Sequence, residues 1–92
     1  RWRGGGRGEP EVLASCYRAC FAIASERQFR TIAFPAIATG IYGFPPEPAA
    51  AIAVTAARTH LAADPMPHEV IFVCFDAAML ETYRAALAQP AA

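Results

Sequence analysis

The chain contains no lysine and no asparagine among its 92 residues, and its formal net charge is zero. Without lysine the nucleotide-binding motif G-x-x-x-x-G-K-[ST] cannot occur, and the dinucleotide motif G-x-G-x-x-G is also absent. A chain without net charge has no general electrostatic attraction to nucleic acid or to anionic membranes. We therefore expect no membrane partner and no nucleic-acid partner, and the single arginine-glycine stretch at residues 1–8 is weak evidence for RNA binding.

Cysteine is scarce, with only Cys16, Cys20 and Cys74 and no Cys-x-x-Cys pair. Three cysteines cannot make a disulfide framework, and the spacing does not favour zinc. We expect buried free thiols, because free cysteine packs like a small apolar residue. No apolar run approaches the roughly 20 residues that cross a bilayer, and no signal peptide is visible. The sequence thus predicts a cytoplasmic protein with no metal and no other cofactor.

The chain is long enough for one small domain, and its 55% hydrophobic content favours a packed core over disorder. Apolar periodicity and proline positions predict five elements in the order helix, strand, helix, strand, helix: residues 10–28, 31–37, 47–63, 70–75 and 77–87. The strand–helix–strand unit predicts an α/β fold with parallel strands and a right-handed crossover.

Apolar spacing also predicts which side chains face the core. In the three helices these are Leu13, Cys16, Cys20 and Ile23, then Ala50, Val54, Ala57 and Leu61, then Leu80, Tyr83 and Leu87. The continuous apolar run 70–75 indicates a strand covered on both faces, and Asp76 is the expected N-cap of the last helix. His60 and His68 have no carboxylate or cysteine at catalytic spacing, so we expect both to be solvated on the surface.

A glycine-punctuated segment, TIAFPAIATGIYGFPP at residues 31–46, joins the first strand to the second helix. Gly40 and Gly43 lack a Cβ, so an anion can approach the main chain closely. A helix N-terminus adds about half a positive charge and free backbone N–H groups. In parallel sheets ligands bind beyond the carboxyl ends of the strands, which places this loop and the Phe75-Asp76 exit on one rim.

The stretch Ile37 to Pro45, IATGIYGFP, resembles the second phosphate-binding loop of the macrodomain family of ADP-ribose-binding modules and de-ADP-ribosylating enzymes. Other stretches resemble the family in the same order. Residues 2–6 with Glu9, followed by residues 13–17, resemble the stretch before and into a central helix. Residues 31–35 resemble the next strand, and residues 69–76 resemble the last strand and its exit. The subgroup that it resembles is the bacterial O-acetyl-ADP-ribose deacetylase and mono-ADP-ribosyl hydrolase type.

The resemblance implies a ligand site in which main-chain amides of residues 39–42 hold the diphosphate of ADP-ribose. Tyr42 would lie near the distal ribose and Phe75 near the adenine. The expected ligand-binding residues are Ala38, Thr39, Gly40, Ile41, Tyr42, Gly43 and Phe75. Ala38 stands where the family most often has serine, so one hydrogen bond, about 1 kcal/mol, is forgone. Glycine spacing alone favours a simple glycine turn that joins strand to helix. The alternative for Tyr42 is an exposed loop tyrosine, and Phe75 is equally a core residue with Asp76 as the cap.

The resemblance starts about halfway through a macrodomain, so we expect residues 1–92 to be the carboxyl-terminal portion of a single macrodomain. They would form an α-β-α-β-α piece of a three-layer αβα fold. The family's Asn-Ala-Ala-Asn segment and its first glycine-rich loop with the catalytic aspartate have no counterpart here. No catalytic residue is therefore assigned. Because two strands leave unpaired edges, we expect the isolated chain to be marginally stable, dimeric or prone to aggregate.

The function that the resemblance implies is ADP-ribose binding, with hydrolysis of O-acetyl-ADP-ribose or of ADP-ribosyl-protein esters as the family role. This chain would supply the diphosphate-binding loop. The expected partners are ADP-ribose or O-acetyl-ADP-ribose and an ADP-ribosylated protein. Two alternatives remain: a binding-only reader of ADP-ribose, and a non-functional truncated fragment.

Overall fold

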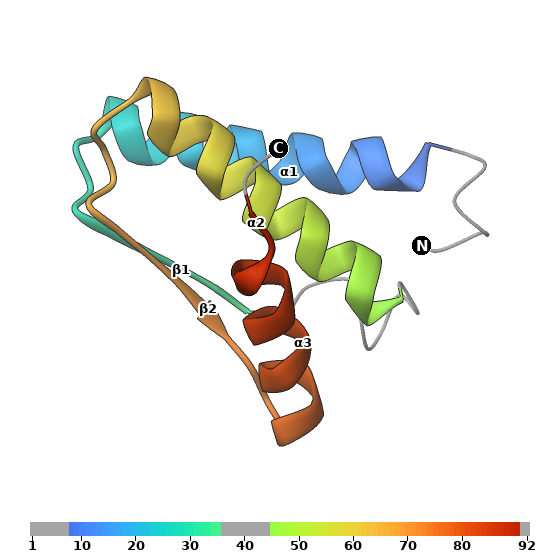
Figure 1. The fold of residues 1–92 in the computed structure, drawn as a ribbon. Coiled ribbons are helices and arrows are strands. Elements are labelled where there is room, and N and C mark those ends of the chain that lie inside the picture. Colours follow the sequence, from blue (N-terminus) through green and yellow to red (C-terminus); the bar gives the residue numbers. More distant parts are fainter. Residues whose placement is uncertain (1–7, 36–44, 91–92) are drawn as a thin grey trace.

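The computed structural model describes residues 8–35 and 45–90. They form α1 (Glu9–Glu26), β1 (Thr31–Pro35), α2 (Pro46–Ala63), β2 (Glu69–Val73) and α3 (Ala77–Ala88), as Figure 1 shows. The predicted order of elements is confirmed. Residues 36 and 37, which the sequence assigns to the first strand, lie outside the described residues.

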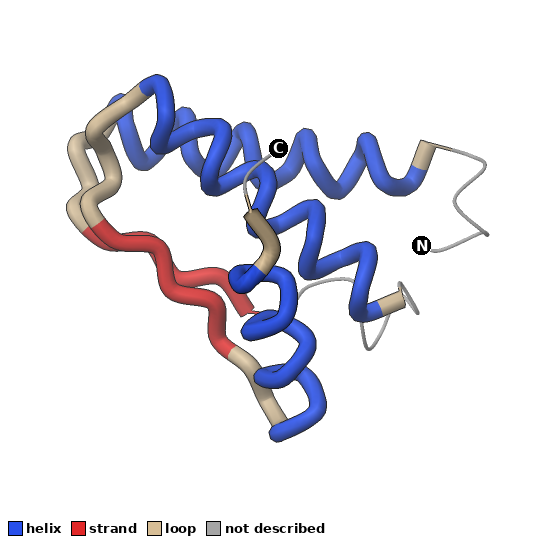
Figure 2. Tube along the Cα trace, in the orientation of Figure 1, coloured by secondary structure: helices blue, strands red, loops and turns tan. Residues whose placement is uncertain are grey.

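The two strands lie side by side and run parallel (Figure 2). Thr31 pairs with Glu69 and Pro35 pairs with Val73, so both strands begin and end at the same level. Helix α2 is the crossover between them. The predicted α/β class with parallel strands is confirmed.

One face of this sheet packs against the helices and the other face is open. Residues alternate along each strand, and Phe34 is buried while Val70 and Phe72 are partly buried in the core. On the opposite face Ile71 and Val73 are 41% and 42% exposed. The prediction that residues 70–75 are covered on both faces is therefore wrong, because the described helices pack against one face only.

An aromatic cluster around Phe34 joins the sheet to the helices. The Phe34 ring lies edge-on to Tyr17 at 5.0 Å and to Phe21 at 5.3 Å, between ring centroids. It stacks on Phe72 of the neighbouring strand at 6.2 Å, and Phe72 in turn lies 5.3 Å from Tyr83 of α3. Contacts of this geometry add about 0.5–1.5 kcal/mol per pair to the burial of the rings.

Helix α1 presents a different face to the core from the one that apolar spacing predicted. Its buried residues are Leu13, Tyr17, Phe21 and Ala24. Leu13 is as expected, whereas Cys16, Cys20 and Ile23 are exposed. The helix has two adjacent apolar faces, and the aromatic one is buried because it meets Phe34.

Helix α2 is buried mainly through small side chains and lies between α1 and α3 (Figure 1). Its buried residues are Ala49, Ala50, Ala53, Val54 and Ala57. Alanine lets neighbouring backbones come close, so this helix can touch both others. Leu61, predicted to face inward, is exposed near the end of the helix.

Helix α3 starts at a conventional cap. The Asp76 carboxylate accepts a hydrogen bond from the Met79 N–H at 2.8 Å, which confirms the predicted N-cap. Tyr83 is buried as predicted, but Leu80 and Leu87 are exposed. Burial raises the pKa of both Tyr17 and Tyr83, because the charged phenolate is disfavoured away from water.

A polar connection ties the end of α2 to α1. Asp64 accepts hydrogen bonds from the Ser25 hydroxyl and from the Met66 N–H, and these bonds, the Ser25 bond foremost, lower the pKa of the Asp64 carboxyl. His60 stacks on Phe21 at 5.1 Å, and its Nε2 lies 2.7 Å from the Met66 carbonyl oxygen. The prediction of a solvated His60 is wrong because the ring packs on α1, while His68 is exposed as predicted.

Within residues 8–35 and 45–90, no helix combines the length and the apolar content that a bilayer span requires.

Replacing Phe34 by alanine should remove most of the stability of the fold. We expect a loss of about 3–5 kcal/mol, because the ring is buried and contacts both strands and α1. Urea unfolding followed by circular dichroism measures this. Phe29→Ala is the matched control, because Phe29 is exposed in the α1–β1 connection and its loss should cost less than about 1 kcal/mol. Equal losses in both variants would contradict the central role of Phe34.

Asp64→Asn should destabilise the protein at neutral pH and lose this effect in acid. The folded-state pKa of Asp64 lies below its ordinary value of 3.8, so the stabilisation by the carboxylate is present above about pH 3.8 and disappears as the pH falls through the folded-state pKa. Thermal melts of wild type and variant should therefore converge below about pH 3.8. Glu81→Gln, at an exposed position of α3, should leave the pH dependence unchanged.

Candidate functional site

The carboxyl ends of β1 and β2 form one rim of the molecule, and α2 and α3 begin there. The pairing of Pro35 with Val73 fixes the two strand ends at the same level. The chain leaves β1 at Pro35 and enters α2 at Pro46, so both anchor points of the intervening segment belong to this rim. In open α/β sheets this is the side at which ligands bind.

Six of the seven predicted ligand-binding residues belong to that intervening segment and lie outside the described residues: Ala38, Thr39, Gly40, Ile41, Tyr42 and Gly43. Their assignment stays a prediction.

Phe75 is the predicted site residue that the structure describes, and it stands at the rim two residues after the end of β2. Its side chain is 73% exposed, so the alternative of a core phenylalanine is wrong. The residue after it, Asp76, is turned toward the first turn of α3 by its bond to the Met79 N–H. An aromatic ring is thus open to solvent beside a carboxylate whose position is fixed.

The start of α2 is poorer in hydrogen-bond donors than a typical helix N-terminus. Pro46 and Pro48 carry no N–H, and the Ala49 N–H already donates to the Pro45 carbonyl oxygen at 3.1 Å. Glu47 adds a negative charge in the first turn. An anion at this rim would therefore find few free N–H donors at the start of α2, contrary to the expectation for a helix N-terminus. The prolines that cause this are visible in the sequence.

The described residues hold no group of three or more histidine, cysteine, aspartate or glutamate side chains close enough to bind a metal ion together. Cys16 and Cys20 are exposed and Cys74 is partly buried. The expectation of three buried thiols is wrong, because the two helix cysteines lie on the face of α1 that no described element covers.

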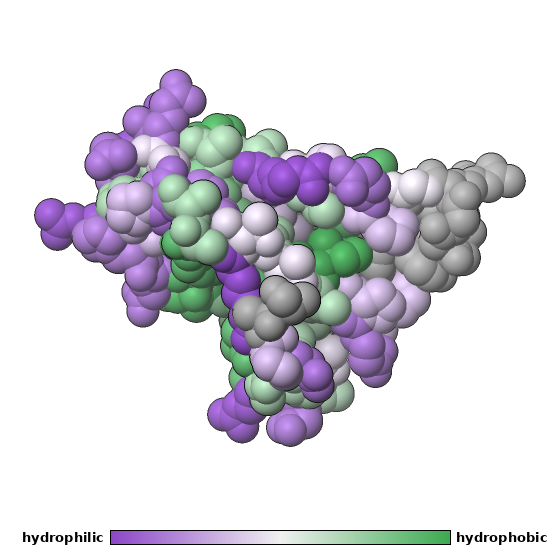
Figure 3. Space-filling view, turned by 45° about the horizontal axis from the view of Figure 1, so that its top comes forward, coloured by the Kyte–Doolittle hydropathy of each residue, from purple (hydrophilic) through white to green (hydrophobic). Residues whose placement is uncertain are grey.

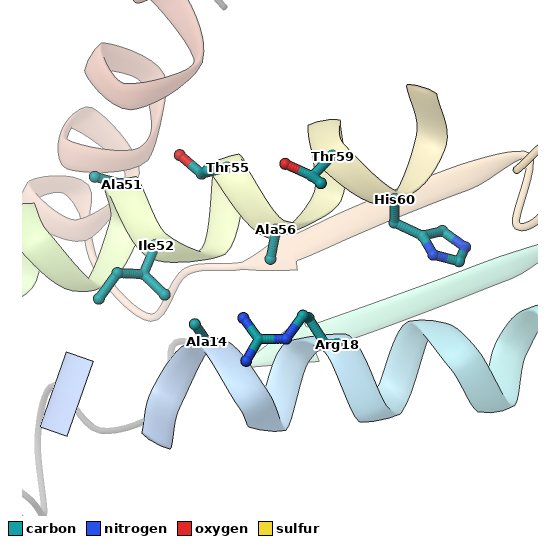
Figure 4. A pocket seen from close by; sticks show the side chains of 8 residues that line it. All are labelled: Ala14, Arg18, Ala51, Ile52, Thr55, Ala56, Thr59 and His60. Atoms are coloured by element: carbon teal, nitrogen blue, oxygen red, sulfur yellow. The ribbon is translucent and has the colours of Figure 1, made fainter. Parts of the chain in front are cut away.

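An open hollow of about 490 Å³ lies between α1 and α2 (Figure 4). Ala14 and Arg18 of α1 and Ile52, Ala56 and His60 of α2 point into it. Arg18 is already engaged by the Glu11 carboxylate and by the Ser15 hydroxyl at 2.9 Å, and the other groups do not converge on a common point. Sequence spacing could not reveal this hollow because it arises from the packing of two helices. The hollow is concave, but its lining side chains form no evident reactive group.

The fold and the rim are those of a small parallel α/β protein, and the sequence assigns it to a family. The family described as Macro domain matches residues 1–53, which is more than half of the chain. The chain therefore belongs to the macrodomain family.

The relatives and solved structures that it resembles are longer macrodomains, of which this chain covers between 33% and 51%. The macro domain-containing protein CT2219 of Chlorobaculum tepidum is 54% identical over 95% of this chain and 51% of its own length. The O-acetyl-ADP-ribose deacetylase of Enterobacter cloacae is 46% identical over 96% of this chain and 49% of its own length. The chain thus spans about half the length of the curated relatives that it matches.

Solved structures give the same result for the fold. The Oceanobacillus iheyensis macrodomain with ADP matches 94% of this chain and 45% of that protein with a TM-score of 0.84 at 31% identity. The Trypanosoma brucei macrodomain in complex with ADP matches 86% of this chain and 34% of that protein with a TM-score of 0.83 at 31% identity. The predicted fold class, a part of a three-layer α/β macrodomain fold, is confirmed.

Proposed function

We propose that this chain binds ADP-ribose at the carboxyl rim, with residues 38–43 at the diphosphate and Phe75 at the adenine. The observation that carries the proposal is the exposed Phe75, two residues beyond β2, whose last residue, Val73, pairs with Pro35 at the end of β1. Base-on-ring stacking contributes about 1–3 kcal/mol. Two of the solved macrodomains that resemble this chain are described with ADP.

The charges at the rim support this division of the ligand. Asp76 and Glu47 are both acidic and stand at the starts of α3 and α2. A diphosphate beside either carboxylate would be repelled, whereas an uncharged base beside Phe75 would not. We therefore expect main-chain amides of residues 39–42 to bind the diphosphate. Gly40 and Gly43 would let it come close to the main chain, because they lack a Cβ.

For the reaction, we propose that this half of a macrodomain contributes binding and that the catalytic groups come from elsewhere. One relative is named O-acetyl-ADP-ribose deacetylase, which supports hydrolysis of such esters by the whole protein. Among the described rim residues, the Asp76 carboxylate accepts the cap bond of α3, and Glu47 stands in the first turn of α2. A reader that binds ADP-ribose without turnover is the second candidate, and the engagement of the Asp76 carboxylate in this cap favours it.

Phe75→Ala should weaken ADP-ribose binding by about 5- to 150-fold, the equivalent of 1–3 kcal/mol of stacking. Phe75→Trp should retain affinity, because it keeps an aromatic face. Isothermal titration calorimetry with ADP-ribose measures both variants. Phe29→Ala is the matched control, since Phe29 is also exposed but precedes the amino end of β1, at the opposite end of the sheet.

Ribose 5-phosphate provides the internal check, because it lacks the base. Its weaker binding should be the same for wild type and Phe75→Ala. If Phe75→Ala lowered the affinity for both ligands equally, or for neither, the placement of adenine on Phe75 would be wrong.

The 92-residue chain alone should not hydrolyse O-acetyl-ADP-ribose above the uncatalysed rate. Chromatographic assay of released ADP-ribose tests this, with the Enterobacter cloacae deacetylase as a positive control. Substantial turnover by the chain alone would contradict the proposal that the catalytic groups come from elsewhere. It would not contradict the proposal that this chain binds ADP-ribose.

A further inference from the structure

A groove follows the contact between α2 and α3. Two open hollows form it, one of about 520 Å³ near the starts of the helices and one of about 490 Å³ near their ends. Ala51, Ala86 and Gln89 line both hollows, so the hollows adjoin, and together they are called the α2–α3 groove below. Because both helices begin at the carboxyl rim, they run in the same direction and the groove has two different ends.

The two ends of the α2–α3 groove carry opposite charges. Glu47 and Glu81 line the hollow near the helix starts, and Arg58 lines the hollow near the helix ends. Glu47 and Arg58 are about three turns apart on α2, or about 16 Å along its axis. The other lining residues are uncharged and mostly small, such as Ala51 and Thr55. Over the face drawn in Figure 3, hydrophilic side chains likewise stand in separate groups with paler surface between them. The groove therefore has an acidic end, a basic end and a neutral middle.

The three charged side chains of the groove form no ion pair within residues 8–35 and 45–90. Glu47 and Glu81 are exposed. Arg58 is half-buried, and its Nη2 donates a hydrogen bond to the Leu87 carbonyl oxygen at 2.7 Å. This bond holds the guanidinium at the basic end of the groove, and its other N–H groups can still donate to a carboxylate.

We propose that the α2–α3 groove is the interface of a homodimer, in which a second copy of this chain packs antiparallel across a twofold axis. Rotation about this axis brings the acidic end of each groove to the basic end of the other. Glu47 and Glu81 of one copy then face Arg58 of the second copy, and the same contact forms twice. Two copies packed in parallel would place like charges together, which disfavours that arrangement. The proposal does not depend on ADP-ribose binding.

The spacing of the charges places the twofold axis near the middle of α2. When Glu47 of one copy lies opposite Arg58 of the other, the axis crosses α2 between Ile52 and Ala53, so the two helices overlap along most of their length. Ala51 lies close to this point, and small side chains let packed helices approach closely. The antiparallel order also sets the amino end of each helix beside the carboxyl end of its counterpart, which the helix dipoles favour.

A second copy is favoured over another partner because it carries the matching charges at the matching separation. The two grooves are identical, so both charged contacts form at once. The lining of the groove comes from α2, α3 and the two residues that follow α3, and not from the strands. This dimer therefore differs from one formed through the exposed Ile71 and Val73 of the sheet.

Light scattering after size exclusion, together with sedimentation equilibrium, tests the proposal on the 92-residue chain without ADP-ribose. We expect a dimer that dissociates on dilution. Its Kd should rise with added salt, because ions screen the charges of solvated ion pairs. Since no ligand is present, failure of dimerisation and failure of ADP-ribose binding are separate results.

Charge reversal at the two ends of the groove identifies the interface. Arg58→Glu, and separately the double change of Glu47→Arg with Glu81→Arg, should each raise the Kd of the dimer by about tenfold or more, because like charges then meet at both ends. An equimolar mixture of the two variants should form a heterodimer of about wild-type stability, since every reversed charge then meets an opposite one. Misfolding of either variant would not produce this restoration.

Arg84→Glu is the matched control for Arg58→Glu. Arg84 is exposed on α3 and outside the groove lining, so the variant makes the same change in net charge and should leave the Kd within about twofold of the wild type. Circular dichroism of every variant should match that of the wild type. Because Arg58 also bonds to the Leu87 carbonyl oxygen, the double variant decides the test if Arg58→Glu does not fold.

Four results would overturn the proposal. One is a wild-type chain that stays monomeric at every concentration. Another is a dimer that Arg84→Glu weakens as much as Arg58→Glu does. The third is a dimer that Ile71→Glu dissociates and that the charge reversals leave intact, which would place the contact on the bare face of the sheet. The last is a mixture of the two folded charge-reversal variants that forms no heterodimer, which would exclude antiparallel pairing of the groove ends.

Discussion

Phe34 is the residue through which the two layers of this molecule hold together. Its ring contacts two aromatic residues of α1 and one of β2, and β2 continues the same contact to Tyr83 of α3. The remaining core is largely alanine on α2, which fills space but contributes little apolar area per residue. The orientation of the helices over the strands, and with it the level of the carboxyl rim, therefore depends on one aromatic cluster.

The rim combines a fixed geometry with an unusual charge pattern. Parallel pairing sets the ends of both strands at the same level, so the exits toward α2 and α3 are neighbours. Glu47 stands in the first turn of α2 and Asp76 is the N-cap of α3, and two prolines remove donors from the first turn of α2. A ligand that is anionic in its middle and aromatic at one end suits this arrangement, provided that the connecting segment supplies the main-chain amides. The helix dipole, often the first explanation for anion binding in such folds, has a minor part here.

Most of the residues whose burial was misjudged from apolar spacing lie on α1 and α3. Cys16, Cys20 and Ile23 on α1 and Leu80 and Leu87 on α3 have the spacing of core residues, and all are exposed. Burial in the described residues depends on which neighbouring elements are present. Two adjacent apolar faces on α1 make the point clearly, since only the aromatic face meets Phe34. A periodic pattern can identify candidate faces, but it cannot say which of two faces a given partner covers.

The sequence by itself determined the order and bounds of the elements within a few residues, the parallel crossover, the Asp76 cap and membership of the macrodomain family, because these depend on local spacing, capping chemistry and motifs. It also singled out Phe75 but could not choose between a core residue and an exposed ring. The tertiary structure decided that choice, and it decided the stacked position of His60, the hollow between α1 and α2 and the open sheet face. Each of these depends on contacts between residues far apart in the chain, and such contacts leave no periodic trace in the sequence.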